Sequence, residues 1–371
     1  MTHLLQRLAL AGAMTALAVP TVAQTSSALV TKIEKVRDDV GRAKFSAQGD
    51  TIAFDRPAER GLYQIYTMRT DGSFERCLTC AHYDLRKTNA FNPAWHPSGD
   101  LVVFQVQKQA RRLDLGPIEM ATANRGLFSD LWIADVGGKR IWQLTQVVPN
   151  GGAIIDPHFS YEGSQLLWSE RVVSRVGRWG TWVLRVATLK GDKIPRLAKP
   201  QVFQPGRQKL FLTGSAFTPD DRGVFIAGNR EEGQRENGMD IYRVDLATKR
   251  AERLTHSRNA WDEKARVTAK GDRILWVSAG EITLRDAGAE PKLPLEQLRE
   301  LWVMDLDGGD KQRLTYFNHP GANESLRAAI VNDFSQSPDG SEVLMHVIWP
   351  WRDRPRESLF RLELDESFHR R

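Results

Sequence analysis

Polar and charged residues recur just before the apolar strands of this chain, and they are the residues best suited to bind or react with a ligand. The positions are Asn92, Asp156, His158, Glu263, Asn332 and Asp333. Glu170 follows the next strand after His158, and a histidine paired with a carboxylate can hold a metal ion or move a proton. One such pair supplies too few ligands for a metal site. The sequence therefore gives no catalytic residue, no metal and no cofactor.

Arginines gather in the segments between the expected strands, where Arg171 and Arg178 lie close to the histidine–carboxylate pair in sequence. A guanidinium group binds carboxylates through two parallel hydrogen bonds. Trp351, in Trp349-Pro350-Trp351, offers a stacking surface for a sugar or peptide. One interpretation is a polar axial pocket with an arginine-rich entrance for an anionic ligand. The alternative is a solvated channel mouth with ordinary polar loops.

Cys77 and Cys80 are the two cysteines of the chain, and two residues lie between them in sequence. They follow a strand pattern, whereas a thioredoxin-like redox pair begins a helix. No further ligands at suitable spacing complete a zinc site. We therefore expect a local structural disulfide, which requires an oxidising compartment.

Residues 1–23 have the order of a secretory signal peptide: a short basic head with Arg7, an apolar run, and Thr21-Val22-Ala23 before the cleavage point. We expect a periplasmic or secreted chain without a transmembrane segment, in which residues 24–371 form one domain. Cleavage of residues 1–23 removes one positive charge, that of Arg7, so the net charge falls from +6 to +5. Lysines and arginines are scattered, whereas a nucleic-acid-binding protein concentrates them on one face, so no nucleic-acid partner is expected.

A segment of the form Phe-Ser-x-x-Gly, followed by an apolar strand, occurs six times. The copies begin at Phe45, Trp95, Phe159, Phe217, Val267 and Gln336. Most copies continue with two more strand patterns, such as Asp130 to Asp135 and Ile141 to Thr145, joined by Asp-Gly or Gly-Gly turns. Four antiparallel strands per repeat form one blade of a β-propeller, and each blade must stack on its neighbours.

The sixth copy uses up the chain after three strands. The alternating segment Leu29 to Lys35 precedes the first copy, so we expect it to complete the last blade and close the ring. The fold class is therefore all-β, a six-bladed propeller. Its short turns should lie on one face and its long connections on the other, where binding sites usually form.

These units resemble the TolB-type β-propeller repeat, also called the WD40-like PD40 repeat. The resemblance covers roughly residues 25 to 365, and its clearest turn is Ser337-Pro338-Asp339-Gly340. It implies a propeller that binds other envelope components. The Tol-Pal member of the family also carries an N-terminal α/β domain, whereas about twenty residues separate Ala23 from the first repeat here. Related propellers precede peptidase domains, but this sequence has no Gly-x-Ser-x-Gly nucleophile motif.

Two functions follow from these observations. The first is a monomeric, non-enzymatic binding or scaffold module whose long-loop face contacts an envelope protein, a peptide or an anionic polymer. The alternative is a lyase or hydrolase that acts on an anionic saccharide at the axial channel, either with or without a metal ion.

Overall fold

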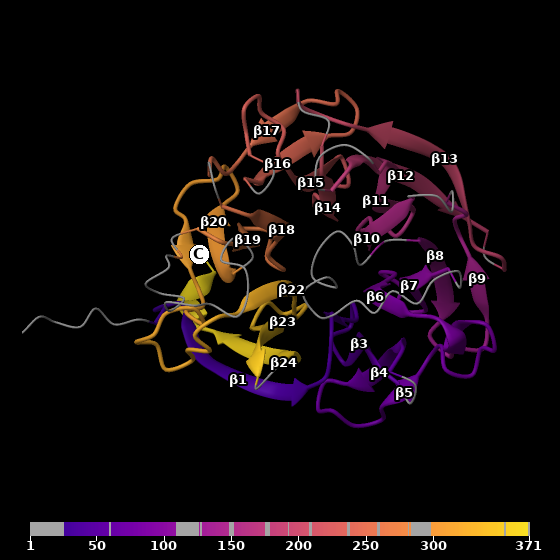
Figure 1. Cartoon of the computed structure of the whole chain (residues 1–371), viewed down its shortest axis with the longest axis horizontal. Helices are drawn as coiled ribbons and strands as arrows, with labels where there is room; N and C mark the ends of the chain where they lie inside the picture. The colour runs from indigo at the N-terminus through magenta and orange to yellow at the C-terminus, as the bar shows by residue number, and fades with distance from the viewer. Residues whose placement is uncertain are drawn as a thin grey trace, which may run out of the picture.

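Six four-stranded antiparallel sheets surround a central axis in a computed structural model (Figure 1). The described residues are 26–58, 61–108, 126, 128–147, 152–174, 179–191, 193–207, 210–235, 238–257, 260–280, 282, 298–351 and 354–369. The signal-peptide segment, residues 1–23, lies outside them. The expected six-bladed, all-β propeller is confirmed.

The first three blades run in chain order. Blade 1 comprises β2 (Ala43–Phe45), β3 (Thr51–Pro57), β4 (Tyr63–Arg69) and β5 (Arg76–Cys77). Blade 2 comprises β6 (Ala90–Trp95), β7 (Leu101–Gln107), β8 (Ser129–Asp135) and β9 (Ile141–Gln143). Blade 3 comprises β10 (Ala153–Phe159), β11 (Gln165–Val173), β12 (Thr181–Lys190) and β13 (Arg196–Phe203).

The remaining blades follow the same plan. Blade 4 comprises β14 (Leu212–Phe217), β15 (Gly223–Gly228), β16 (Asp240–Asp245) and β17 (Ala251–Arg253). Blade 5 comprises β18 (Asp262–Val267), β19 (Arg273–Ser278), β20 (Glu300–Asp305) and β21 (Gln312–Arg313). Blade 6 comprises β22 (Ile330–Gln336), β23 (Glu342–Trp351), β24 (Arg354–Leu364) and the N-terminal β1 (Val30–Asp38).

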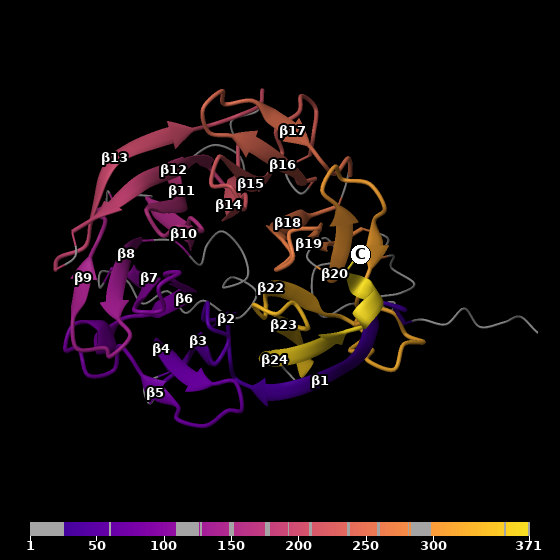
Figure 2. The ribbon, with the colours of Figure 1, turned by 180° about the vertical axis from the view of Figure 1, so that it is seen from behind.

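The N-terminal strand closes the ring, as the sequence predicts. β1 pairs antiparallel with β24, from Val30 opposite Leu364 to Asp38 opposite Ser358. Both views of the ribbon show β1 along the outside of the last blade (Figure 2). The two ends of the described chain are therefore held in one sheet.

The repeated Phe-Ser-x-x-Gly segment forms the turn between the first two strands of a blade. In blade 6 the Ser337 hydroxyl donates to Asp339 Oδ1 (2.6 Å) and accepts the N–H of Glu342 (3.0 Å). Thr218 in blade 4 makes the equivalent bonds to Asp220 and Gly223. The glycine of the turn, Gly340, has φ of +83°, a conformation that side chains rarely adopt. The motif recurs because each blade needs this turn.

A Leu-Thr pair ends the outer strand of four blades for an equally local reason. The Thr315 hydroxyl accepts the N–H of Leu301 (2.9 Å) and donates to Glu300 Oε2 (2.6 Å). The same threonine arrangement recurs in the other three: Thr79 with Gln64, Thr145 with Asp130, and Thr255 with Asp240. Each threonine thus links the end of the fourth strand of the blade to the start of the third strand.

Replacing Thr315 with valine keeps the shape of the side chain but leaves the Leu301 N–H and Glu300 Oε2 without this partner. We expect the free energy of unfolding to fall by about 1–3 kcal/mol, as for other buried polar groups that lose a partner. Urea denaturation measures the change. The exposed Thr31→Val is the control and should alter stability by less than about 0.5 kcal/mol. Equal stability of both variants would contradict the role given to Thr315.

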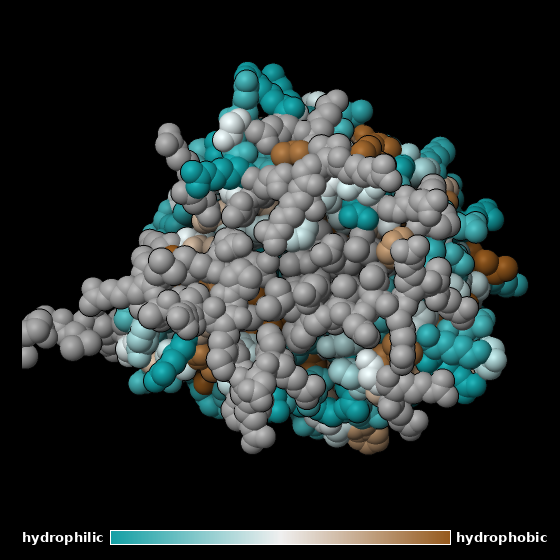
Figure 3. All heavy atoms as spheres, in the orientation of Figure 1, coloured by the Kyte–Doolittle hydropathy of each residue, from teal (hydrophilic) through white to brown (hydrophobic). Residues whose placement is uncertain are grey.

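The apolar core lies between the blades. Trp182 of blade 3, Phe225 of blade 4 and Trp276 of blade 5 are almost fully buried in one continuous cluster. The rim of the ring is largely hydrophilic where its residues are described (Figure 3). On the outer strand of blade 1, Cys77 and Cys80 form the expected disulfide. No described helix has the length and apolar character needed to cross a membrane.

Candidate functional site

The innermost strands carry a bulge that turns one residue toward the axis. The register with the second strand shifts in β6, β10, β14, β18 and β22. Asn92, Asp156 and Lys264 stand at equivalent bulge positions with φ values of 58°, 55° and 64°. Positive φ is unfavourable for residues with a side chain and is often retained at functional sites.

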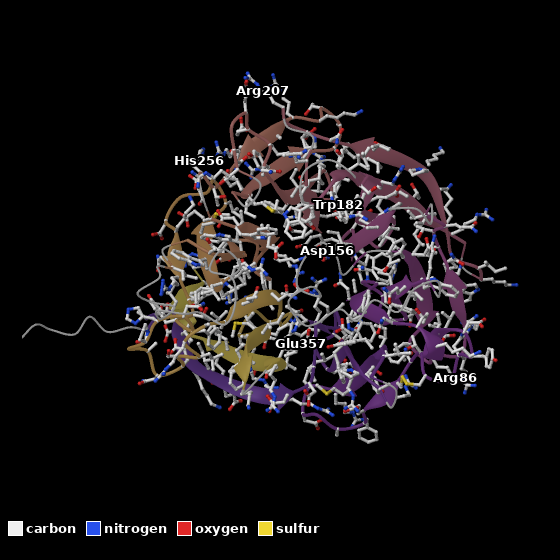
Figure 4. The ribbon with its side chains drawn as sticks, viewed as in Figure 1. Arg86, Asp156, Trp182, Arg207, His256 and Glu357 are labelled. Carbon is white, nitrogen blue, oxygen red and sulfur yellow. A yellow bond between two sulfur atoms is a disulfide. The ribbon has the colours of Figure 1, made fainter. Side chains whose placement is uncertain are left out.

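The residue three positions before the end of each inner strand forms an axial layer. These residues are Arg42, Asn92, Asp156, Gly214, Lys264 and Asp333. All except the glycine are polar, and every one of the polar five is less than 5% exposed. Asp156 lies close to the axis, whereas Arg86, Arg207 and His256 lie at the periphery (Figure 4).

Asp156 joins four blades through its two carboxylate oxygens. Oδ1 accepts from Arg42 Nη1 (3.2 Å) and Asn92 Nδ2 (3.1 Å). Oδ2 accepts from Lys264 Nζ (2.6 Å) and the Thr213 hydroxyl (2.6 Å). Burial opposes ionisation, but the nearby Lys264 and Arg42 outweigh it and hold the pKa of Asp156 far below its usual range.

Asp333 is the second acidic centre of the axis. It accepts from Lys44 Nζ (2.5 Å) and Arg266 Nη2 (2.9 Å), and Arg42 Nε lies 4.0 Å away. Burial favours its neutral form, yet Lys44 and then Arg266 keep the pKa of Asp333 well below the usual range. Four cations therefore surround two ionised carboxylates in the centre of the ring.

A cavity of about 320 Å³ lies at the axis on the face of the short turns. Every blade contributes to its wall, and the strand-end rings of Phe45, Trp95, Phe159 and Phe217 form an aromatic collar. Lys44, Arg266 and His158 are its charged or titratable lining groups, and no carboxylate lines it among the described residues. Such a cavity, hereafter the axial pocket, favours an anionic group with an apolar body.

His158 is held neutral in the axial pocket. Burial, followed by the positive charges of Arg266 and Lys44, lowers the pKa of His158 well below its usual range. Its Nε2 atom is buried and makes no hydrogen bond to a described residue. The pKa of Lys44 is also lowered well below its usual range, first by burial and then by Arg266. A bound anion would favour the protonated form of both groups.

A second polar chain connects the inner strands of blades 5 and 6. Arg299 Nη1 pairs with Glu263 Oε1 (2.8 Å), and its Nη2 donates to Asn332 Oδ1 (3.3 Å). Asn332 in turn contacts His346 Nδ1 (3.1 Å). His346 Nε2 stands 3.7 Å from Glu357 Oε1. These bonds fix the positions of Glu263 and Asn332 and therefore stabilise the bulges of β18 and β22.

The structure brings most of the predicted site residues together, but in a different way. Asn92, Asp156, Glu263, Asn332 and Asp333 are buried inside the ring, whereas the sequence led us to expect them on the rim of the channel. They point inward, where Asp156, Glu263 and Asp333 pair with neighbouring cations and the two asparagines make hydrogen bonds. Of the predicted residues whose side chains the structure describes, His158 alone lines the axial pocket.

The expected pairing of His158 with Glu170 is wrong. Glu170 lies on β11 and pairs with Arg185 of β12 (2.6 Å), because the two side chains share one face of the sheet. No hydrogen bond or ion pair within the described ranges joins it to His158. Arg171 follows Glu170 on β11, and partial burial lowers its pKa. Arg178 and the Trp351 side chain lie outside what the structure describes.

Several site residues were missed at the sequence level. They are Arg42, Lys44, Lys264, Arg266 and Arg299, all cations of the inner ring. Their signal was present, because Lys44 and Arg266 stand at the same position of the repeat as His158. Arginines were sought in the long connections, whereas Arg266 lies on the inner strand β18 and Arg42 directly precedes the inner strand β2.

The chain is similar to solved β-propeller structures. TolB from Acinetobacter baumannii is 17% identical with a TM-score of 0.50, over 86% of this chain and 65% of that one. A TolB candidate from Agrobacterium tumefaciens is 16% identical with a TM-score of 0.54, over 85% and 91%. An oligogalacturonate lyase in complex with manganese is 14% identical with a TM-score of 0.52, over 91% and 97%.

These likenesses show the fold, a β-propeller. The chain spans less than two thirds of the length of the Acinetobacter protein. No protein-family model and no curated protein matches the sequence. In the described part of the chain, no three His, Cys, Asp or Glu side chains form a group suited to a metal ion.

Proposed function

We propose that this chain is an exported, TolB-type binding module whose axial pocket holds an anionic group of an envelope protein, a peptide or a polymer. The observation that carries the proposal is the axial pocket itself: Lys44, Arg266 and His158 line it within an aromatic collar, without a lining carboxylate. The lyase alternative needs a base beside the substrate, and the carboxylate expected to assist His158 is engaged by Arg185.

Export is supported by the signal-like residues 1–23 and by the Cys77–Cys80 disulfide. We place the mature chain in the periplasm or outside the cell on these two grounds. Fractionation of cells that produce the full-length chain tests the placement, and an uncleaved chain in the cytoplasm would contradict it.

The wild-type protein should bind a fluorescent Glu-rich decapeptide, and it should bind the matched Gln-rich peptide much more weakly. Lys44→Met and His158→Gln each remove a lining donor, so we expect about tenfold weaker binding, which corresponds to about 1.4 kcal/mol. Fluorescence anisotropy in low and high salt measures it. The control is Lys108→Met, which lies outside the axial pocket. Equal binding of both peptides, or no effect of either pocket variant, would overturn the proposal.

The same binding should depend on pH with a definite sign. The pKa values of His158 and Lys44 are depressed in the free protein, and a bound anion raises both. Binding therefore takes up protons. Above the pH range in which the glutamates of the peptide protonate, affinity falls as the pH rises from the depressed pKa values of the free protein to the higher values of the complex. Calorimetry in buffers of different ionisation enthalpy counts the protons. His158→Gln should reduce the uptake.

A further inference from the structure

A second cleft lies between blades 1 and 2, away from the axial pocket. Its volume is about 690 Å³, and Trp132 of β8 and Gln107 of β7 line it together with Lys108, Asp130 and Asp84. Gln143 and Gln146 add two more amide side chains to the wall. We call it the Trp132 cleft.

Gln107 presents a buried donor whose orientation is determined by its neighbours. The N–H of Tyr63 donates to Asn89 Oδ1 (2.9 Å), so the other end of that amide, Nδ2, is the donor. Asn89 Nδ2 then donates to Gln107 Oε1 (2.8 Å). Gln107 Nε2 must therefore be the free end, and it has no hydrogen-bond partner among the described residues. Gln107 is 4% exposed, and a buried amide donor is normally hydrogen-bonded.

Trp132 supplies an apolar surface in the same cleft. Its side chain is partly exposed, whereas Trp302, at the equivalent place in blade 5, is 7% exposed and packs against Trp276 at 5.8 Å. The ring in blade 2 is thus more exposed than its counterpart in blade 5, although His82 packs against it at 6.3 Å. An open indole ring next to polar groups suits a ligand with one apolar face and several oxygens.

The charges of the Trp132 cleft disfavour an anion. Two carboxylates, Asp84 and Asp130, accompany one lysine, and Lys108 Nζ already contacts Asp130 Oδ2 at 3.1 Å. Asp130 also accepts from Thr145 and from the N–H of Val147. The cleft therefore differs in sign from the axial pocket and should take a different class of ligand.

We propose that the Trp132 cleft is a binding site for a neutral saccharide. One sugar ring stacks on Trp132, and an oxygen of that ring or of an acetamido substituent accepts from Gln107 Nε2. The Gln146 amide offers a further polar contact to the surrounding hydroxyls, whereas the Nε2 of Gln143 already donates to Thr145 O (2.7 Å). The proposal is independent of the axial pocket, because the two sites share no lining residue.

The test is calorimetric titration of the full mature protein with tri-N-acetylchitotriose and with cellotriose, each up to 10 mM. Binding of either sugar should weaken about tenfold or more in Trp132→Ala. It should weaken about fivefold or more in Gln107→Glu, which keeps the acceptor for Asn89 but loses the donor. Trp142→Ala, on the neighbouring β9 and outside the cleft, is the matched control and should bind like the wild type.

Thermal melting of each variant separates lost binding from lost folding. A preference for tri-N-acetylchitotriose assigns the acceptor to the acetamido oxygen, and equal binding assigns it to a hydroxyl or ring oxygen. Binding of neither sugar at 10 mM, or binding that survives both Trp132→Ala and Gln107→Glu, overturns the proposal. So does a crystal structure, grown with sugar, in which Gln107 Nε2 contacts a water molecule only.

Discussion

Replacing Asp156 with asparagine is expected to lower the free energy of unfolding by about 3–5 kcal/mol, which is typical for removing one partner of a buried ion pair. Its four donors come from four blades, and asparagine offers them one oxygen and an amide that is itself a donor. Arg42 and Lys264 would then be buried with too little negative charge. Urea denaturation at pH 7 measures the loss.

Two further variants show whether charge is the cause. Glu232→Gln removes a carboxylate whose ion pair with Arg207 is about four-fifths exposed, so its effect should stay below about 0.5 kcal/mol. In the double variant Asp156→Asn/Lys264→Met, one of the unpaired cations is also gone. It should therefore be more stable than the sum of the single changes predicts. A strictly additive double variant would show that shape rather than charge explains the loss.

Removing residues 1–38 should lower the melting temperature by about 10 °C or more. The truncation leaves blade 6 with three strands and exposes the whole edge of β24, which β1 covers in the intact chain. Leu29, Val30 and Ile33 leave the apolar cluster of blades 5 and 6 at the same time. An open strand edge also pairs readily with other chains, so size-exclusion chromatography with light scattering should detect association.

Adding the missing strand in trans provides the control for that experiment. A synthetic peptide of residues 26–40 should raise the melting temperature of the truncated chain in a concentration-dependent manner. The same peptide with Ile33→Asp should not, because it places a charge against the core. If the truncated chain melts like the intact one, the N-terminal strand does not hold the ring closed.

The fold was largely readable from the sequence, and the physical reason is local. The hydroxyls of Ser337 and Thr315 accept hydrogen bonds from nearby backbone N–H groups. The same residue types therefore recur at these positions from blade to blade. Closure by β1 followed from counting strands. The Cys77–Cys80 disulfide was also predicted, because two cysteines three residues apart in an exported chain have little choice of partner.

The site was readable only in part, because a bulge breaks the alternation on which strand predictions depend. One extra residue in β10 turns Asp156 toward the axis, and His158 faces the axial pocket instead of the expected rim. Partners in the adjacent blades 1 and 6, such as Lys44 with Asp333, are 289 residues apart in sequence. Nothing in either residue's local sequence indicates the other, so the cations of the inner strands were overlooked.

The pairing of β1 with β24 also determines when the propeller can finish folding. Lys32 lies opposite Glu363, so the first strand to be synthesised has its partner among the last residues of the chain. Blades 1 to 5 can each form from a continuous stretch as it emerges, but β1 must wait for almost the entire polypeptide. Contacts between such distant residues form slowly because the intervening chain must be ordered first. The last step of folding is therefore the pairing of β1 with β24, and a chain that stops before β24 leaves β1 without a partner.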